Sequence, residues 1–133
     1  MRAQKLAALI LCAFIAAPVR AEIASCYGRE HGQTRTATGA PYDPSRLTAA
    51  HRSLPFGTRV LVTDLHDGRS VAVTINDRGP AAWTHRAIDL SLAACRAIGN
   101  SGLTRVFLQI VGGPHEARSR LRSRRHVHHR RRG

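Results

Sequence analysis

Asp77 is the residue whose position in the sequence most directly suggests chemistry. It follows an alternating stretch, residues 71–75, whose valines and isoleucine share one side of a predicted strand, and the same alternation places Asp77 on that apolar side. A carboxyl group in such a position commonly lies at the mouth of a barrel or cleft, where it can act as a general acid or base. The other interpretation is structural: Asp77 caps the turn before Gly79-Pro80 and pairs with Arg78.

The elements expected to position Asp77 are short strands. The segments 59–65 and 71–77 flank an Asp-Gly pair, which is a strong signal for a β-hairpin. Two more strands are predicted near the two ends of the domain, at residues 23–28 and 105–111. With shorter candidates included, the count is about five or six strands, which predicts a small β-barrel or sandwich and excludes an α/β nucleotide-binding fold.

Two connecting segments are also informative. A short helix is predicted between residues 92 and 98, because alanines favour helix and Gly99 suits the position just after a helix end. Ser91 or Asp89 can cap its first turn, and we assign Asp89 to this structural role. Residues 29–41 show no sustained periodicity and are expected to form a long loop, which in a compact domain is more often functional than idle.

The N-terminus is typical of a secretory signal peptide. Basic residues precede an apolar run at 6–17 that is too short to cross a bilayer, and Ala21 suits the position before a cleavage site. We therefore expect residues 1–21 to be removed and the mature protein to be periplasmic or secreted. Cys12 lies too early in the segment and follows a large residue, so we expect no lipid anchor.

Cleavage at this position leaves two cysteines, Cys26 and Cys95. An even pair in an exported chain suggests a disulfide, and the alternative is a pair of buried reduced thiols. A bond between them would close a loop of about 70 residues and stabilise the fold by roughly 4 kcal/mol.

The net charge of +13 belongs mainly to the C-terminal end of the chain. Residues 118–132 hold eight arginines and no acid, whereas residues 22–116 are close to neutral. We expect residues 114–133 to form a disordered tail that binds an anionic envelope surface or has no defined partner. Export argues against a nucleic-acid partner. The histidines of the tail have no cysteine or carboxylate beside them, so no specific metal site is expected.

Six motifs together resemble the rare lipoprotein A (RlpA-like) family of cell-wall proteins. The resemblance covers nearly all of residues 24–111, so we expect one domain at residues 22–113. It implies a double-psi β-barrel, similar to barwin and the expansins, in an exported protein that acts on peptidoglycan. Many members also carry a C-terminal SPOR domain, and we expect a short form without it. The motifs are Ala24-Ser25-Cys26-Tyr27-Gly28, Thr36-Ala37-Thr38-Gly39, Leu47-Thr48-Ala49-Ala50-His51, Leu54-Pro55-Phe56-Gly57-Thr58, Asn76-Asp77-Arg78-Gly79-Pro80 and Ile88-Asp89-Leu90-Ser91.

The resemblance also implies an activity and a set of site residues. Characterised members are lytic transglycosylases that cut between N-acetylmuramic acid and N-acetylglucosamine. The family's catalytic Asp falls on Asp77 and its active-site His on His51. The neighbours Asn76 and Arg78 are expected to contact the substrate. A third family position, usually Glu, falls on Ala40, which is a departure from the family pattern.

Asp43 is the nearest acid to Ala40 in the same part of the chain. It can replace the missing Glu as a substrate contact, although its position before Pro44 also explains it as a turn former.

Two functions follow. Either Asp77 alone protonates the glycosidic oxygen and then deprotonates the muramic acid C6 hydroxyl, or the barrel binds glycan without cleaving it, as expansins are thought to do. Neither requires a cofactor, and we expect a monomer.

Overall fold

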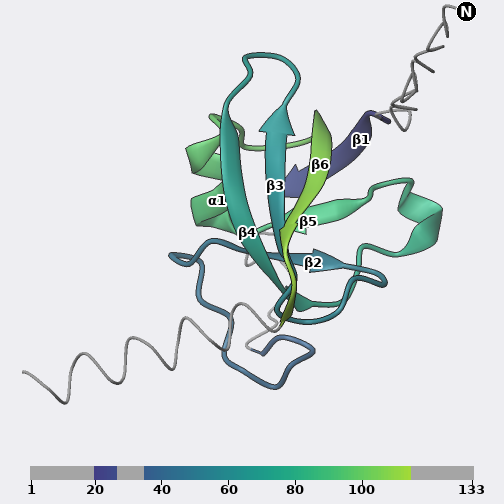
Figure 1. The fold of residues 1–133 in the computed structure, drawn as a ribbon, viewed down its shortest axis with the longest axis vertical. Helices are drawn as coiled ribbons and strands as arrows, with labels where there is room; N and C mark the ends of the chain where they lie inside the picture. The colour runs from purple at the N-terminus through teal and green to yellow at the C-terminus, as the bar shows by residue number, and fades with distance from the viewer. Residues whose placement is uncertain (1–19, 27–34, 115–133) are drawn as a thin grey trace, which may run out of the picture.

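The computed structural model describes residues 20–26 and 35–114, and in this part of the chain six strands close into a barrel (Figure 1). The strand order around the barrel is β1-β5-β2-β4-β3-β6. The fold class predicted from the sequence, a mainly β barrel with one short helix, is therefore confirmed. The elements are β1 (Glu22–Cys26), β2 (Thr48–His51), β3 (Arg59–Asp64), β4 (Ser70–Asp77), the 3-10 turn η2 (Ala82–Thr84), β5 (Ile88–Leu90), α1 (Leu92–Ala97) and β6 (Thr104–Gly112).

Parallel and antiparallel pairs are mixed around the barrel. The pairs β1–β5 and β2–β4 are parallel, and the other four neighbouring pairs are antiparallel. A parallel pair cannot be joined by a tight turn, so the chain must cross the barrel between its two members. This arrangement is the double-psi barrel that the family resemblance implied.

The predicted hairpin is the β3–β4 pair, with Val62 opposite Val71. Along β4 every second residue is buried, and this alternation continues without interruption to Asp77. The apolar residues of both strands fill the barrel together with residues of β1, β5 and β6, because the interior of a small barrel is just wide enough for its own side chains. The fully buried members include Val60, Val62, Val73, Ile75, Ile88, Leu90 and Val106.

The helix α1 covers one side of the barrel and is tied to β1 by a disulfide. Ser91 is the N-cap, since its side chain accepts a hydrogen bond from the Ala94 backbone N–H. The assignment of Asp89 as the cap is wrong: this residue lies inside β5 and is buried. Cys95 faces the core and forms the predicted disulfide with Cys26, across a sequence separation of 69.

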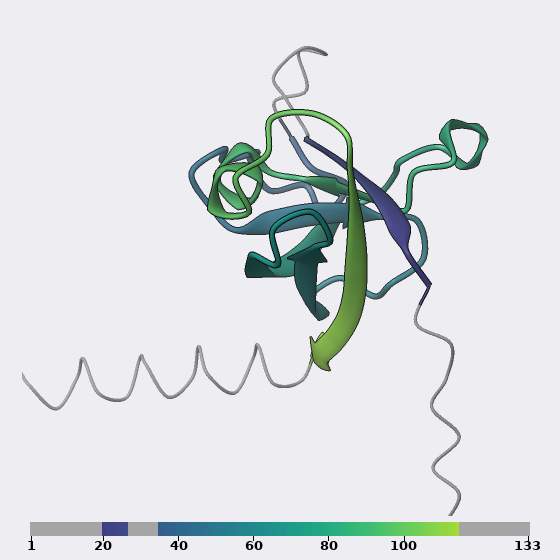
Figure 2. The same cartoon turned by 90° about the horizontal axis from the view of Figure 1, so that it is seen from above.

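The loop between β4 and β5 carries η2 and projects from the barrel in both views (Figures 1 and 2). No helix within residues 20–26 and 35–114 is long and apolar enough to cross a membrane. Residues 1–19 of the predicted signal peptide lie outside the described residues. The same is true of residues 115–133 of the predicted tail and of residues 29–34 of the predicted loop at 29–41.

Candidate functional site

Asp77 is the last residue of β4 and is only 7 % exposed. Its Oδ1 atom accepts two backbone hydrogen bonds, one from Ala37 N–H and one from Arg78 N–H, each at 2.8 Å. The inward orientation predicted from the alternation is therefore confirmed. Asp77 does close the turn that follows it, as the structural interpretation proposed, but it also holds a segment forty residues away.

That distant segment is a tight turn at residues 36–40. The Thr36 backbone N–H donates to the Ala40 carbonyl at 2.9 Å, and the Thr36 hydroxyl donates to the same oxygen at 3.2 Å. Ala40, where the family usually has Glu, thus lies on the turn that contacts Asp77, and its side chain is exposed. A glutamate at this position would add a carboxylate to the turn that contacts Asp77 through Ala37.

Arg78 connects Asp77 to the end of β2. Its Nη1 donates to the carbonyl oxygens of His51 at 3.2 Å and Leu54 at 2.8 Å. Its guanidinium carbon also lies 3.8 Å from the centre of the Phe56 ring, which is a cation–π contact. The positive charge is therefore fixed beside the candidate site.

His51 is the last residue of β2 and is partly buried. Its Nδ1 accepts hydrogen bonds from the backbone N–H groups of Ser53 and Leu54, both at 3.1 Å, so Nδ1 carries no proton and Nε2 does. Burial lowers the pKa of His51, and the positive charges of Arg52 and Arg78 lower it further. The ring is thus a neutral imidazole that presents an Nε2–H donor.

A small cavity brings Asn76 and Asp77 together with residues of β2 and β5. Ala50 on β2 is paired with Asp77 on one side and with Asp89 on the other. The β2–β4 register shifts between Ala49 and Ala50, and the α-carbons of Asp77 and Asp89 lie on either side of Ala50, two strand spacings or roughly 10 Å apart. Both line the cavity, together with Tyr42.

Asp43 lies outside that cavity, as far as the described residues define it. Its Oδ1 accepts hydrogen bonds from the backbone N–H of Ser45 at 2.9 Å and from the Ser45 hydroxyl at 2.6 Å. These bonds, the hydroxyl bond first, lower the pKa of Asp43 despite its exposure to solvent. The turn role expected from Pro44 accounts for these contacts.

A family model described as "Lytic transglycolase" matches residues 19–110. The chain belongs to this family. Curated relatives include the "Probable endolytic peptidoglycan transglycosylase RlpA" of Synechocystis sp., which is 54 % identical over 95 residues that cover 70 % of this chain and 29 % of that protein. The "Endolytic peptidoglycan transglycosylase RlpA" of Pseudomonas aeruginosa (strain PAO1) is 49 % identical over 89 residues, covering 65 % of this chain and 25 % of that protein.

The "Endolytic peptidoglycan transglycosylase RlpA" of Escherichia coli O157:H7 is 42 % identical over 93 residues, which cover 70 % of this chain and 25 % of that protein. The match thus spans less than a third of the length of each of these relatives. Among solved structures, "Streptomyces papain inhibitor (SPI)" matches with a TM-score of 0.48 and 22 % identity, covering 71 % of this chain and all of that one.

Within this member of the lytic transglycolase family, the residue that sequence reasoning missed is Asp89. It is 8 % exposed, accepts a short hydrogen bond from the Ser25 hydroxyl and lies 3.8 Å from Arg86 Nε. Its place just before Ser91 made a helix cap the simplest interpretation. The sequence signal that could have identified Asp89 as buried is its place between two apolar residues, Ile88 and Leu90. Three consecutive buried positions, as found here, are typical of a strand that is covered on both faces.

Among the described residues, no group of three or more His, Cys, Asp or Glu side chains is arranged to hold a metal ion.

Proposed function

We propose that this protein is an exported lytic transglycosylase, a lyase that cleaves the bond between N-acetylmuramic acid and N-acetylglucosamine in peptidoglycan and leaves 1,6-anhydromuramyl ends. The observation that carries the proposal is a buried carboxyl at the end of β4, Asp77, in a chain of the lytic transglycolase family. Relatives that are 42 to 54 % identical bear the name of peptidoglycan transglycosylase, which supports the same substrate here.

In this mechanism Asp77 acts twice. As a general acid it donates its proton to the glycosidic oxygen, and as a base it then accepts the proton of the C6 hydroxyl when that oxygen attacks the anomeric carbon within the same sugar. Because no water is activated, one carboxyl suffices where most glycoside hydrolases need two. The hydrogen bonds from Ala37 and Arg78 to Oδ1 fix the orientation of the carboxyl group.

The other site residues bind and orient the sugar. The Nε2–H of His51 donates a hydrogen bond to a substrate oxygen, which its fixed tautomer suits it to do. Asn76 and Arg78 contact the substrate beside Asp77, and Asp43 contacts it from the turn before Pro44. We do not assign a cofactor to this reaction.

The protein works outside the cytoplasm in this proposal. Peptidoglycan lies there, and the Cys26–Cys95 disulfide is favoured by an oxidising compartment. Residues 1–21 act as a signal peptide without a lipid anchor, residues 22–113 form the working barrel as a monomer, and the arginine-rich tail at 114–133 associates with anionic envelope surfaces rather than with nucleic acid.

Ala40 favours a second candidate, a barrel that binds peptidoglycan without cleaving it. The family's usual carboxylate is missing from the turn that contacts Asp77. If that carboxylate is essential to the chemistry, the remaining cavity, cation and imidazole still provide a glycan-binding surface.

The test uses the mature protein on denuded glycan strands, with 1,6-anhydromuramyl products measured by mass spectrometry. Asp77→Asn retains an oxygen that accepts both backbone N–H bonds, so it should fold normally and lose at least about 100-fold in rate. Thermal unfolding of the variant checks the fold.

Ala40→Glu is measured in parallel and is expected to increase the rate. Products from the wild type that Asp77→Asn abolishes support the enzyme. Glycan binding without products from either the wild type or Ala40→Glu would replace the enzyme with the non-catalytic binder.

A further inference from the structure

A broad groove of about 1270 Å³ lies beside the loop that carries η2. It runs from Trp83 and Arg86 on that loop past Leu103 to the region around Gly99 at the end of α1. Its lining does not include Asp77, Asn76 or His51, so it is separate from the small cavity at the candidate site. Its volume exceeds the 300–1,000 Å³ or so of a pocket for one small molecule, which suits a polymer better.

The groove exposes large apolar side chains. Trp83 is 81 % exposed and Leu103 is 67 % exposed, and Leu65 adds further apolar surface. An indole ring that stands this far into solvent gains nothing for the fold, whereas clustered exposed apolar groups mark binding surfaces. Tryptophan supplies a flat apolar face together with an N–H donor, which matches a sugar ring with its C–H face and its peripheral hydroxyl and amide groups.

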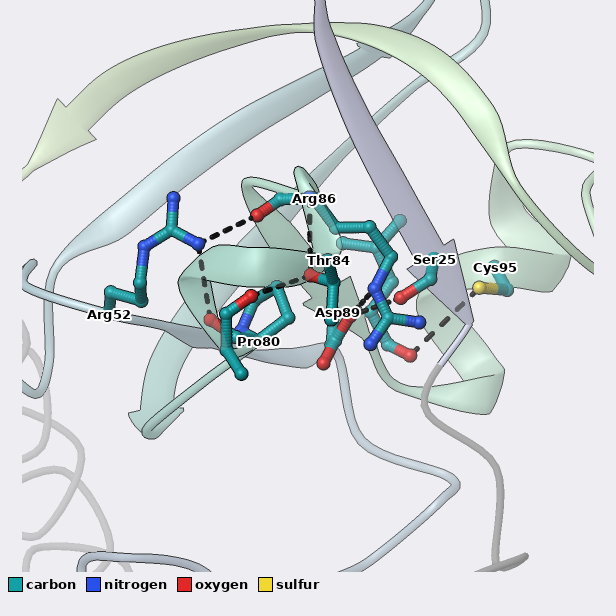
Figure 3. Close-up of polar contacts among 9 residues, drawn as sticks. Ser25, Arg52, Pro80, Thr84, Arg86, Asp89 and Cys95 are labelled. Atoms are coloured by element: carbon teal, nitrogen blue, oxygen red, sulfur yellow. Dashed lines mark hydrogen bonds and ion pairs between the residues drawn. The ribbon is translucent and has the colours of Figure 1, made fainter.

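The loop that presents Trp83 is fixed by polar contacts at both ends (Figure 3). Arg52 Nη1 donates to the carbonyl oxygens of Pro80 at 3.2 Å and Arg86 at 3.0 Å. Within the loop, the Thr84 hydroxyl donates to a backbone carbonyl of the same turn at 2.7 Å. An aromatic side chain on a preorganised loop loses little conformational entropy on binding.

The same contacts connect the groove to the candidate site. Arg52 directly follows His51, and the loop begins after Arg78, whose backbone N–H is bonded to Asp77. A polymer that occupies the groove and the end of β4 would thus contact one continuous segment, residues 77–86.

Several of the charged groups around the groove are paired, and Arg105 adds a further positive charge to its lining. Asp67 pairs with Arg69 at 3.3 Å, and Arg86 pairs with Asp89 at 3.8 Å. The remaining acid, Asp64, accepts hydrogen bonds from a threonine hydroxyl and from backbone N–H groups. A surface with few unpaired charges and an exposed indole complements a sugar chain that carries at most one lactyl carboxylate per disaccharide better than it complements a highly charged peptide.

We propose that this groove, the Trp83 groove, binds a stretch of the N-acetylated glycan strand away from the bond that is cleaved, with Trp83 stacked on a sugar ring. The inference rests on the proposed function, because it takes the same polymer as substrate. Trp83 in this role is a binding residue: it raises the affinity for long strands and takes no part in proton transfer.

The experiment exploits the fact that Trp83 is the chain's single tryptophan. Asp77→Asn protein, which leaves the strands intact, is titrated with denuded glycan strands and with N-acetylglucosamine hexasaccharide while tryptophan emission is recorded. A shift of the emission to shorter wavelength that saturates with the added glycan is expected, because stacking removes the indole from water.

Affinity is then measured by co-sedimentation with insoluble denuded glycan. Trp83→Ala should weaken binding about tenfold, and Trp83→Phe should restore most of it. The matched control is Ile110→Ala, which removes a side chain that is 60 % exposed on β6 outside the groove and should leave affinity unchanged.

Three results would overturn the inference: no emission change while glycan binds, unchanged affinity of Trp83→Ala, or an emission change with the free stem peptide but not with glycan. Failure of the proposed function looks different. If wild-type protein releases no anhydromuramyl products but glycan shifts the emission and Trp83→Ala binds weakly, the catalytic proposal falls and the glycan groove stands.

Discussion

Replacing His51 with asparagine separates the two roles that its ring can have. The Nδ1 atom accepts hydrogen bonds from the backbone N–H groups of Ser53 and Leu54, which fixes the bend after β2. The oxygen of an asparagine side chain can occupy nearly the same place as Nδ1 and accept both bonds, but asparagine has nothing at the position of Nε2. His51→Asn therefore keeps the structural role and removes the proposed contact with the sugar.

The magnitudes differ enough to distinguish the roles. His51→Ala removes the acceptor of two hydrogen bonds in a partly exposed place, which should cost about 1–2 kcal/mol in unfolding free energy. In a domain of this size that loss lowers Tm by roughly 5–15 °C. His51→Asn should lose under about 0.5 kcal/mol and yet reduce kcat/KM at least about 100-fold, a typical loss for a positioned donor.

The wild type and His51→Asn together test the protonation state of His51. Because the folded pKa of His51 is lowered from 6.5, the unfolded chain binds a proton there before the folded protein does. Stability from this group is thus intact above about pH 6.5 and falls as the pH decreases from there toward the folded pKa. Urea unfolding at pH 7.5 and pH 5.5 should show a larger loss for the wild type than for His51→Asn.

Two outcomes would refute this reasoning about His51. Activity of His51→Asn within a factor of about three of the wild type would leave the imidazole with a structural role alone. An equal loss of stability in both proteins on acidification would show that His51 is not the group that remains neutral in the fold.

Three further predictions concern residues behind the site. Replacing Cys26 and Cys95 together by serine opens a loop with a sequence separation of 69 and should cost about 4 kcal/mol, or roughly 15–30 °C in Tm, and a loss below about 1 kcal/mol in calorimetry would contradict it. Asp89→Asn retains an acceptor but removes the charge opposite Arg86, and should cost about 1–3 kcal/mol in denaturant unfolding while leaving the helix signal of the folded protein intact. Ser91→Ala, which removes the actual cap, should instead weaken α1 by about 1 kcal/mol, and a helix signal lost in Asp89→Asn would reverse the assignment.

The strand that carries Asp77 was predictable because its information is local. Alternation of period two fixes which residues face the core, and the Asp-Gly pair fixes where the hairpin turns. The structure agrees on both points: β3 and β4 pair around that turn, and burial alternates along β4 as far as Asp77. The helix and its disulfide were predictable for similar reasons, from alanine content and an even count of cysteines.

The neighbours of Asp77 were not predictable from local pattern, because they come from distant segments. The contact with Ala37 joins residues forty positions apart, and the register that places Ala50 between Asp77 and Asp89 depends on how three separate strands pair. A backbone N–H leaves no trace in the sequence as a hydrogen-bond donor. The tautomer of His51 was unpredictable for the same reason, since both groups that donate hydrogen bonds to its ring are backbone N–H groups.

The orientation of Asp77 does not depend on which side chain stands at position 40. The turn contacts Asp77 through the backbone N–H of Ala37 and closes through the backbone of Thr36, so neither bond depends on the side chain at position 40. Ala40 is also exposed, and a longer side chain there meets solvent rather than core. Loss of the family's glutamate therefore leaves Asp77 oriented as before and removes only a charge from its surroundings. It follows that Ala40→Glu changes activity without changing the fold, and that the rate of this variant measures the glutamate's chemical contribution alone.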